Sequence, residues 1–348
     1  MFTNIHDLCN ILTMILAFFI TIILGKYLIP VLTKLKYGQS ILEIGPSWHK
    51  SKQGTPTMGG ITFIIGIIIS SCIFVFFHYF YASLNNFFVN NVMMTKVISG
   101  IIMSALFGII GFSDDYIKIK NKSNMGLKAK QKILLQFLVT AGYLAAIYIS
   151  ETYYLGTANT WIEIPFFGRI NFDLFYWPLC LLIITGIVNA VNLTDGVDGL
   201  CGCVSFIVGI GYMLIARILG YTEIGIQAAA LIGGCIGFLF WNFHPAKVFM
   251  GDTGSLFLGG LICALGFGTG KIIILIILSM IYILEMFSVI TQVIYFKLSK
   301  GKRLFKMSPI HHHFEIIGYK EPRICAIFTF SSIVFVAISI LLIILGIL

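Results

Sequence analysis

Residues 174–191 read LFYWPLCLLIITGIVNAV, an 18-residue run without a single charged side chain. A helix needs about 20 mostly apolar residues to cross the hydrocarbon core of a bilayer, so this run predicts a transmembrane helix. The nine residues that follow, NLTDGVDGL (192–200), contain two aspartates and two glycines. The run therefore predicts both a membrane span and, at its end, a polar segment that could carry chemistry.

The composition of the whole chain is typical of a membrane protein. Of its 348 residues, 58% are hydrophobic and only 11% are charged, whereas soluble domains usually have about 25% charged residues. The net charge of +9 does not indicate nucleic-acid binding, because the basic residues gather in a few loops. The eight cysteines are scattered and contain no Cys-x-x-Cys pair, so we interpret them as small buried hydrophobic residues.

Outward from residues 174–191, nine further segments are long and apolar enough, or nearly so, to span a bilayer. The ten predicted spans are 9–32, 59–81, 96–113, 132–150, 174–191, 200–218, 225–242, 253–270, 272–297 and 325–347. The segment 272–297 would be about 39 Å long as a straight helix, so it must tilt, bend or break. We predict an all-α polytopic membrane protein with a single domain covering residues 1–348.

The loops predict the orientation of the chain. If the N-terminus lies outside, the inside loops and helix ends hold 19 of the 23 basic residues. This asymmetry follows the positive-inside rule and predicts that both termini are periplasmic. Residues 161–172, in an outside loop, partly alternate apolar and polar side chains around Gly168, which predicts a short β-hairpin.

Acidic residues are rare, so their positions are informative. Of the 14 acidic residues, five gather at inside ends of three predicted helices: Asp114, Asp115, Asp195, Asp198 and Asp252. Carboxylates near a membrane are costly and are usually functional. The alternative is that they pair with nearby lysines as solvated helix ends, which is less plausible for five aspartates on three segments.

Two of these segments favour a site for metal and phosphate. Asp114 and Asp115 precede Lys118 by one helical turn, and carboxylates bind Mg²⁺ while an ammonium group binds phosphate. Asp252 follows Gly251 where a span begins, and helix N-termini bind anions. Asp252 could also act only as a helix cap.

The segment after residue 188 places amides and acids at every third position: Asn189, Asn192, Asp195 and Asp198. On a helical turn this spacing stacks the side chains roughly on one face. Gly196 and Gly199 permit a break or a close approach of the backbone to a ligand.

Two other loops contain candidate ligand-binding residues. His311, His312 and His313 are consecutive, so they cannot all face one zinc ion on a regular helix, and we expect phosphate contact or proton transfer instead. The loop KQGTPTMGG (52–60) combines a lysine, hydroxyls and glycines, which suits a polyanionic ligand but also an ordinary membrane-entry turn.

Together these segments resemble the phospho-N-acetylmuramoyl-pentapeptide transferases, a branch of the polyprenyl-phosphate N-acetylhexosamine-1-phosphate transferases. GTPTMGG (54–60) and PIHHHFE (309–315) look specific to this branch. The resemblance implies a Mg²⁺-dependent bacterial inner-membrane enzyme with a cytoplasmic active site, and it makes a homodimer plausible. The implied reaction transfers phospho-N-acetylmuramoyl-pentapeptide from UDP to undecaprenyl phosphate, which yields lipid I and UMP.

The resemblance also implies roles for individual residues. Asp252 would be the main metal ligand, and Phe249 would stack on uracil. The implied catalytic residues are Asp114, Asp115, Asp252 and His311. The implied substrate-binding residues are Lys52, Thr57, Lys118, Lys130, Asn192, Asp195, Gly196, Asp198, Phe249, Gln292, His312 and His313.

Two other functions remain open from the sequence. A sibling transferase that uses UDP-N-acetylglucosamine shares the aspartate motifs, although the histidine-containing segment 309–315 argues against this function. An ion-coupled transporter would place its acids near the bilayer midplane, whereas here they lie at helix ends. Glu285 is the one acid deep within a predicted span, and we expect it to face the protein interior or a helix break.

Overall fold

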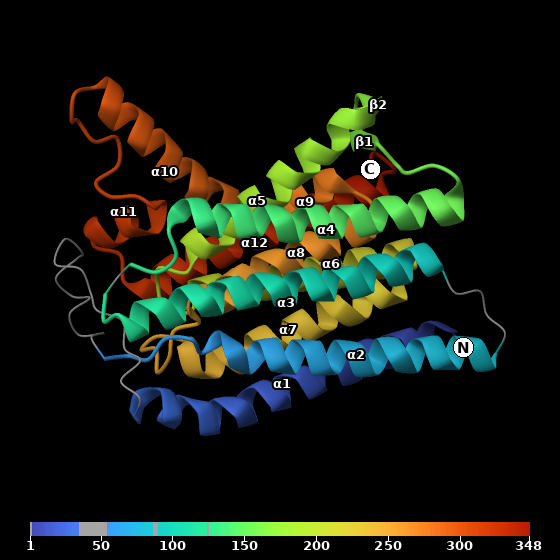
Figure 1. Cartoon of the computed structure of the whole chain (residues 1–348), viewed down its shortest axis with the longest axis horizontal. Coiled ribbons are helices and arrows are strands. Elements are labelled where there is room, and N and C mark those ends of the chain that lie inside the picture. Colours follow the sequence, from blue (N-terminus) through green and yellow to red (C-terminus); the bar gives the residue numbers. More distant parts are fainter. Residues whose placement is uncertain (1, 35–53, 86–89, 124) are drawn as a thin grey trace.

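The computed structural model describes residues 2–34, 54–85, 90–123 and 125–348, and these form a bundle of helices with one small sheet (Figure 1). The helices are α1 (Phe2–Lys34), α2 (Gly60–Leu84), α3 (Asn91–Lys120), α4 (Ala129–Leu155), α5 (Tyr176–Thr194), α6 (Leu200–Leu219), α7 (Thr222–Asn242), α8 (Gly251–Thr269), α9 (Ile272–Leu278), α10 (Met280–Leu298), α11 (Ile310–Ile316) and α12 (Glu321–Ile344). The 3₁₀ helix η2 (Asp173–Phe175) precedes α5, and the strands are β1 (Trp161–Ile164) and β2 (Gly168–Asn171).

The prediction of about ten transmembrane helices is confirmed. Ten helices among the described residues are long and apolar enough to cross a membrane. Large apolar side chains such as Phe19, Phe76, Ile109 and Leu138 are exposed on the outside of the bundle. A soluble protein rarely exposes so much apolar surface, whereas lipid chains would cover it.

The long ninth predicted span is broken. Helix α9 ends at Leu278 and α10 begins at Met280, with the fully buried Ser279 between them. In Figure 1, α10 leans away from the bundle toward α11. The break thus sends the second half of the segment in a new direction, and Glu285 lies on that second half.

Helix α8 is the centre of the bundle. Every residue from Thr253 to Thr269 is buried, and α3 is the neighbour that packs against α8 most extensively. Close packing of the two helices requires Gly111 on α3, because a Cβ atom there would lie 2.0 Å from the carbonyl oxygen of Asp252. Small residues at helix interfaces allow backbones to approach in this way. As a result, the acidic end of α3 lies directly against the first turn of α8.

The predicted hairpin is also present. Strands β1 and β2 pair antiparallel, with Glu163 opposite Arg169. Both chain termini lie toward the hairpin end of the bundle, at the right of Figure 1, and α11 lies at the opposite end.

The interpretation of the cysteines is confirmed for most of them. All eight are free, and six are buried. The interpretation is wrong for Cys72, which is exposed on α2, where the side chains of Phe76 and Ile73 are exposed as well.

Candidate active site

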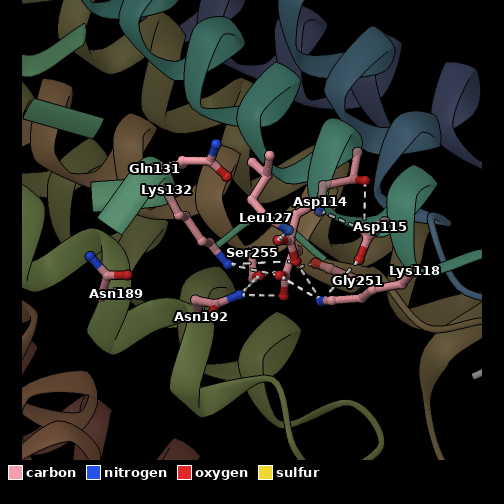
Figure 2. A network of polar contacts seen from close by, with 12 residues as sticks. Asp114, Asp115, Lys118, Leu127, Gln131, Lys132, Asn189, Asn192, Gly251 and Ser255 are labelled. Atoms are coloured by element: carbon pink, nitrogen blue, oxygen red, sulfur yellow. Dashed lines mark hydrogen bonds and ion pairs between the residues drawn. The ribbon is translucent and has the colours of Figure 1, made fainter. Parts of the chain in front are cut away.

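Asp252, in the first turn of α8, is the centre of a polar network that joins α3, α4 and α5. Figure 2 shows Lys118, Lys132 and Asn192 pointing toward one another in this network. Its Oδ2 atom lies 2.9 Å from Nζ of Lys118 and 2.8 Å from Nζ of Lys132. Its Oδ1 atom accepts a hydrogen bond of 2.8 Å from the amide of Asn192, which also donates to Ser255. Side chains from three other helices therefore converge on one carboxylate.

Asp114 and Asp115 are held beside Asp252 by the backbone. Both are almost fully buried, with exposures of 3% and 4%. Asp114 contacts Lys118 at 2.5 Å and accepts a hydrogen bond of 2.7 Å from the backbone N–H of Leu127. Asp115 accepts hydrogen bonds from the backbone N–H (2.9 Å) and the hydroxyl (2.8 Å) of Thr253. These bonds fix both carboxylates before any substrate binds.

The cluster has more negative than positive charge and fits a divalent cation. Carboxylate oxygens of Asp114, Asp115 and Asp252 lie within 4.8 Å of one another. Among the described residues, three carboxylates face two ammonium groups, those of Lys118 and Lys132. Hard oxygen ligands at this spacing match the preference of Mg²⁺ and related cations.

The spacing in the sequence predicts that Asn189, Asn192, Asp195 and Asp198 lie on one helical face, but the segment after α5 is not helical. Helix α5 ends at Thr194, so only Asn189 and Asn192 lie on a helix face. Asp195 adopts a turn conformation, and Gly199 has a φ of 77°, which ends the helical path before α6. The prediction that all four polar residues stack on one face is therefore wrong for Asp195 and Asp198.

Asp195 and Asp198 face different surroundings. Burial, together with the negative charges of Asp252, Asp115 and Asp198, raises the pKa of Asp195 to about 8, against a smaller opposing effect of the Gly251 N–H. Asp195 therefore belongs to the electrostatic field of the cluster around Asp252.

Asp198 is engaged by the loop between α7 and α8. Its carboxylate accepts a hydrogen bond of 3.0 Å from the N–H of Ala246 and lies 3.1 Å from Nδ1 of His244. Its backbone N–H donates to Glu321 of α12 at 2.9 Å. Asp198 thus fixes the polar loop against two other segments.

The three consecutive histidines diverge. His311 is fully buried, and its ring lies against Gly196. His312 lies 2.5 Å from Glu315 on the same helix, and Nδ1 of His313 accepts a hydrogen bond of 3.2 Å from the N–H of Lys306. Of the three, His311 is therefore the one that approaches the loop bearing Asp195.

Two other predicted site residues, Thr57 and Phe249, lie beside the start of α8, whereas Gln292 contacts the loop after α10. Thr57 is buried beside Gly251, whose added Cβ would lie 2.6 Å from the Thr57 hydroxyl oxygen. The backbone of Phe249 bonds to Pro56 and Gly59, which joins the 54–60 loop to the start of α8. The side-chain oxygen of Gln292 accepts hydrogen bonds from the N–H groups of Leu304 and Phe305. Lys52 lies outside the described residues.

Lys132, which the sequence analysis did not select, contacts the acids, whereas the substrate-binding role of Lys130 stays a prediction. Lys132 contacts Asp252 and lies 3.9 Å from Asp114, whereas Lys130 is exposed. The two lysines are two positions apart on α4, so they point to different sides of the helix. The available signal was that Lys132, unlike Lys130, begins the apolar part of the predicted span.

Comparisons with known proteins agree with this geometry. A family model described as glycosyl transferase family 4 matches residues 97–270, which include both the α3 aspartates and Asp252. A second model, phospho-N-acetylmuramoyl-pentapeptide-transferase signature 1, matches residues 52–64.

Full-length relatives carry the same name. The phospho-N-acetylmuramoyl-pentapeptide-transferase of Clostridioides difficile is 45% identical over 94% of this chain and 96% of its own length. The enzyme of the same name from Halalkalibacterium halodurans is 43% identical over 95% of this chain and 97% of its own. That of Desulforamulus reducens is 42% identical, with coverages of 94% and 93%. The chain belongs to the phospho-N-acetylmuramoyl-pentapeptide-transferase family.

Proposed function

We propose that the chain transfers phospho-N-acetylmuramoyl-pentapeptide from UDP-N-acetylmuramoyl-pentapeptide to undecaprenyl phosphate, which gives lipid I and UMP. The observation that carries this proposal is the buried cluster of three carboxylates and two lysines at one end of a membrane bundle. Phosphoryl transfer between two anions requires positioning and charge neutralisation more than covalent chemistry, and this cluster offers both.

The residues of the cluster have different roles in the proposed reaction. Lys118 and Lys132 neutralise phosphate oxygens, and Asp114 and Asp115, fixed by backbone hydrogen bonds, hold Lys118 in place. Asp252, with Asp114 and Asp115 beside it, would hold Mg²⁺. When bound, Mg²⁺ supplies further positive charge to the diphosphate and stabilises the leaving UMP.

The location of the cluster suits one lipid substrate and one soluble substrate. It lies at the ends of transmembrane helices, where a lipid phosphate in the headgroup layer and a nucleotide in water can meet. We place this end on the cytoplasmic side of the bacterial inner membrane and both termini on the periplasmic side, because most basic residues lie in the loops at the cluster end.

The test is a donor comparison with purified protein in detergent. UMP release and lipid-linked product are measured with undecaprenyl phosphate, Mg²⁺ and either UDP-N-acetylmuramoyl-pentapeptide or UDP-N-acetylglucosamine. We expect product only with the first donor. Product only with UDP-N-acetylglucosamine would assign the chain to the sibling branch, and no UMP release with either donor would contradict the proposal.

A further inference from the structure

Glu285 of α10 and His311 of α11 form a fully buried pair of titratable side chains. Both are 0% exposed, and Oε2 of Glu285 lies 3.1 Å from Nδ1 of His311. The contact has the distance but not the angles of a hydrogen bond, and neither carboxylate oxygen of Glu285 bonds to a described residue. Burying a carboxylate that accepts no hydrogen bond is strongly unfavourable. The position of Glu285 beside the imidazole of His311 therefore needs an explanation.

The other side of the His311 ring faces the polar loop after α5. A Cβ atom at Gly196 would lie 2.2 Å from Nε2 and 2.8 Å from Cε1 of His311. The ring can occupy this position only because residue 196 is glycine. Nε2 has no hydrogen-bond partner among the described residues, although it is buried. Nε2 therefore lies against Gly196, the residue after Asp195, and forms no hydrogen bond with a described residue.

The neighbouring His312 has an acidic partner of its own, so it does not compete with His311 for Glu285. His312, whose ring centre is 4.2 Å from that of His311, is in contact with Glu315 on its own helix. The break at Ser279 sets the direction of α10 and so carries Glu285 to α11. An acid inside a membrane span is by default a functional candidate, and its partner here is His311.

We propose that Glu285 is a positioning residue for His311. It orients the imidazole through the 3.1 Å contact with Nδ1, so that Nε2 faces the backbone at Gly196, and a shift of the Asp195–Gly196 loop on substrate binding would bring Nε2 to a phosphate oxygen. The partner of one ring nitrogen fixes the orientation and tautomer of the other. This inference rests on the proposed function, because that function supplies the phosphate oxygen.

The kinetic test replaces the carboxylate with its neutral isostere. For Glu285→Gln we expect kcat to fall roughly 10- to 100-fold, as for other residues that orient a functional histidine, with KM for the nucleotide within about twofold of wild type. Glu285→Asp restores the carboxylate and should recover part of kcat. Glu223→Gln is the matched control, since Glu223 lies 3.6 Å from His78 in a second Glu–His pair at the other end of the bundle, and it should leave kcat unchanged.

A spectroscopic readout separates positioning from general damage. Protein labelled with ¹⁵N-histidine is studied in lipid bilayers by magic-angle-spinning NMR, and the His311 signals are those that disappear in His311→Asn. We expect Glu285→Gln to shift the His311 nitrogen signals and no others. If Glu285→Gln does not fold, Glu285→Asp carries the same test, with a smaller shift and an intermediate kcat.

Two results would overturn the inference: wild-type kcat in Glu285→Gln, or a lowered kcat with unshifted His311 signals. The NMR shift does not depend on the identity of the substrate. If wild-type protein released no UMP, the proposed function would fail, and the spectra would still decide whether Glu285 orients His311.

Discussion

The two ends of the helix bundle handle charge in opposite ways. At the hairpin end, acids and bases balance locally: Lys96 pairs with Glu151 at 2.8 Å, and Arg217 pairs with Asp7 at 3.1 Å. Glu163 contacts both Arg169 and Lys271. At the other end, in the part of the chain that the structure describes, three carboxylates around Asp252 are in contact with two lysines, Lys118 and Lys132.

This difference separates structural charge from functional charge. In a matched pair each charge neutralises the other, whereas an excess of buried carboxylates needs either a bound cation or protonation, which a raised pKa such as that of Asp195 permits. The balanced end is therefore expected to matter for stability, and the unbalanced end for activity.

The largest expected effect is the loss of activity in Asp252→Asn. The substitution removes the charge on which both lysines and the cation converge, so UMP release should fall about a thousandfold or more. The matched control is Asp7→Asn, which breaks the ion pair between Asp7 and Arg217 at the balanced end and should keep wild-type turnover. Turnover above a tenth of wild type in Asp252→Asn would refute this assignment of roles.

Two lysines on α4 sharpen the comparison. Lys132→Met removes a charged contact of 2.8 Å to Asp252, and such contacts contribute about 1.5–3 kcal/mol, so turnover should fall roughly 10- to 100-fold. Lys130 is exposed, and Lys130→Met should have a distinctly smaller effect. The measurement is UMP release by both variants side by side, and equal losses would show that the contact with Asp252 is not what matters.

The pH dependence of stability gives a smaller effect. The raised pKa of Asp195, about 8, means that the folded state binds a proton that the unfolded state releases at lower pH. Its contribution to stability is therefore present at low pH and is lost as the pH rises through about 8. In EDTA, the melting temperature of wild type should fall by a few degrees more than that of Asp195→Asn between pH 7 and pH 9. Parallel curves for the two proteins would exclude this account.

The smallest effect is expected at the balanced end. Burial tends to raise the pKa of Glu163, but the contacts with Lys271 and Arg169 outweigh it and lower the pKa below its usual value. The carboxylate therefore stabilises the fold at neutral pH and stops doing so as the pH falls through the acidic range. Glu163→Gln should lower the melting temperature slightly at pH 7, converge with wild type in acid, and leave turnover unchanged. A loss of turnover would show that this end is not purely structural.

The fold was largely predictable because the bilayer imposes simple rules on sequence. Long apolar runs had to be helices, and residues 272–297 were too long to cross straight, which the break at Ser279 confirms. The burial of Glu285 in the protein interior was also expected and is confirmed. The gathering of aspartates at one end followed from the order of the spans.

Details that depend on packing between distant segments were not predictable. The rotation of α4 about its axis decides that Lys132, and not Lys130, meets Asp252, and the start of the apolar run at Lys132 is only an indirect signal of that rotation. The contacts of Asp198 with Ala246 and Glu321, and of Glu285 with His311, join residues far apart in the chain. Spacing in the sequence places a side chain on an element but does not tell what that element will face.

The most direct test of the comparison between the two ends is the binding of a divalent cation. Mn²⁺ binding to purified protein can be followed by electron paramagnetic resonance, with Mg²⁺ as competitor, for wild type, Asp252→Asn and Asp7→Asn. We predict a saturable site in wild type and Asp7→Asn that Mg²⁺ displaces and that Asp252→Asn lacks. Equal binding by wild type and Asp252→Asn, or no binding by wild type, would contradict the claim that the excess of carboxylates exists to hold a cation.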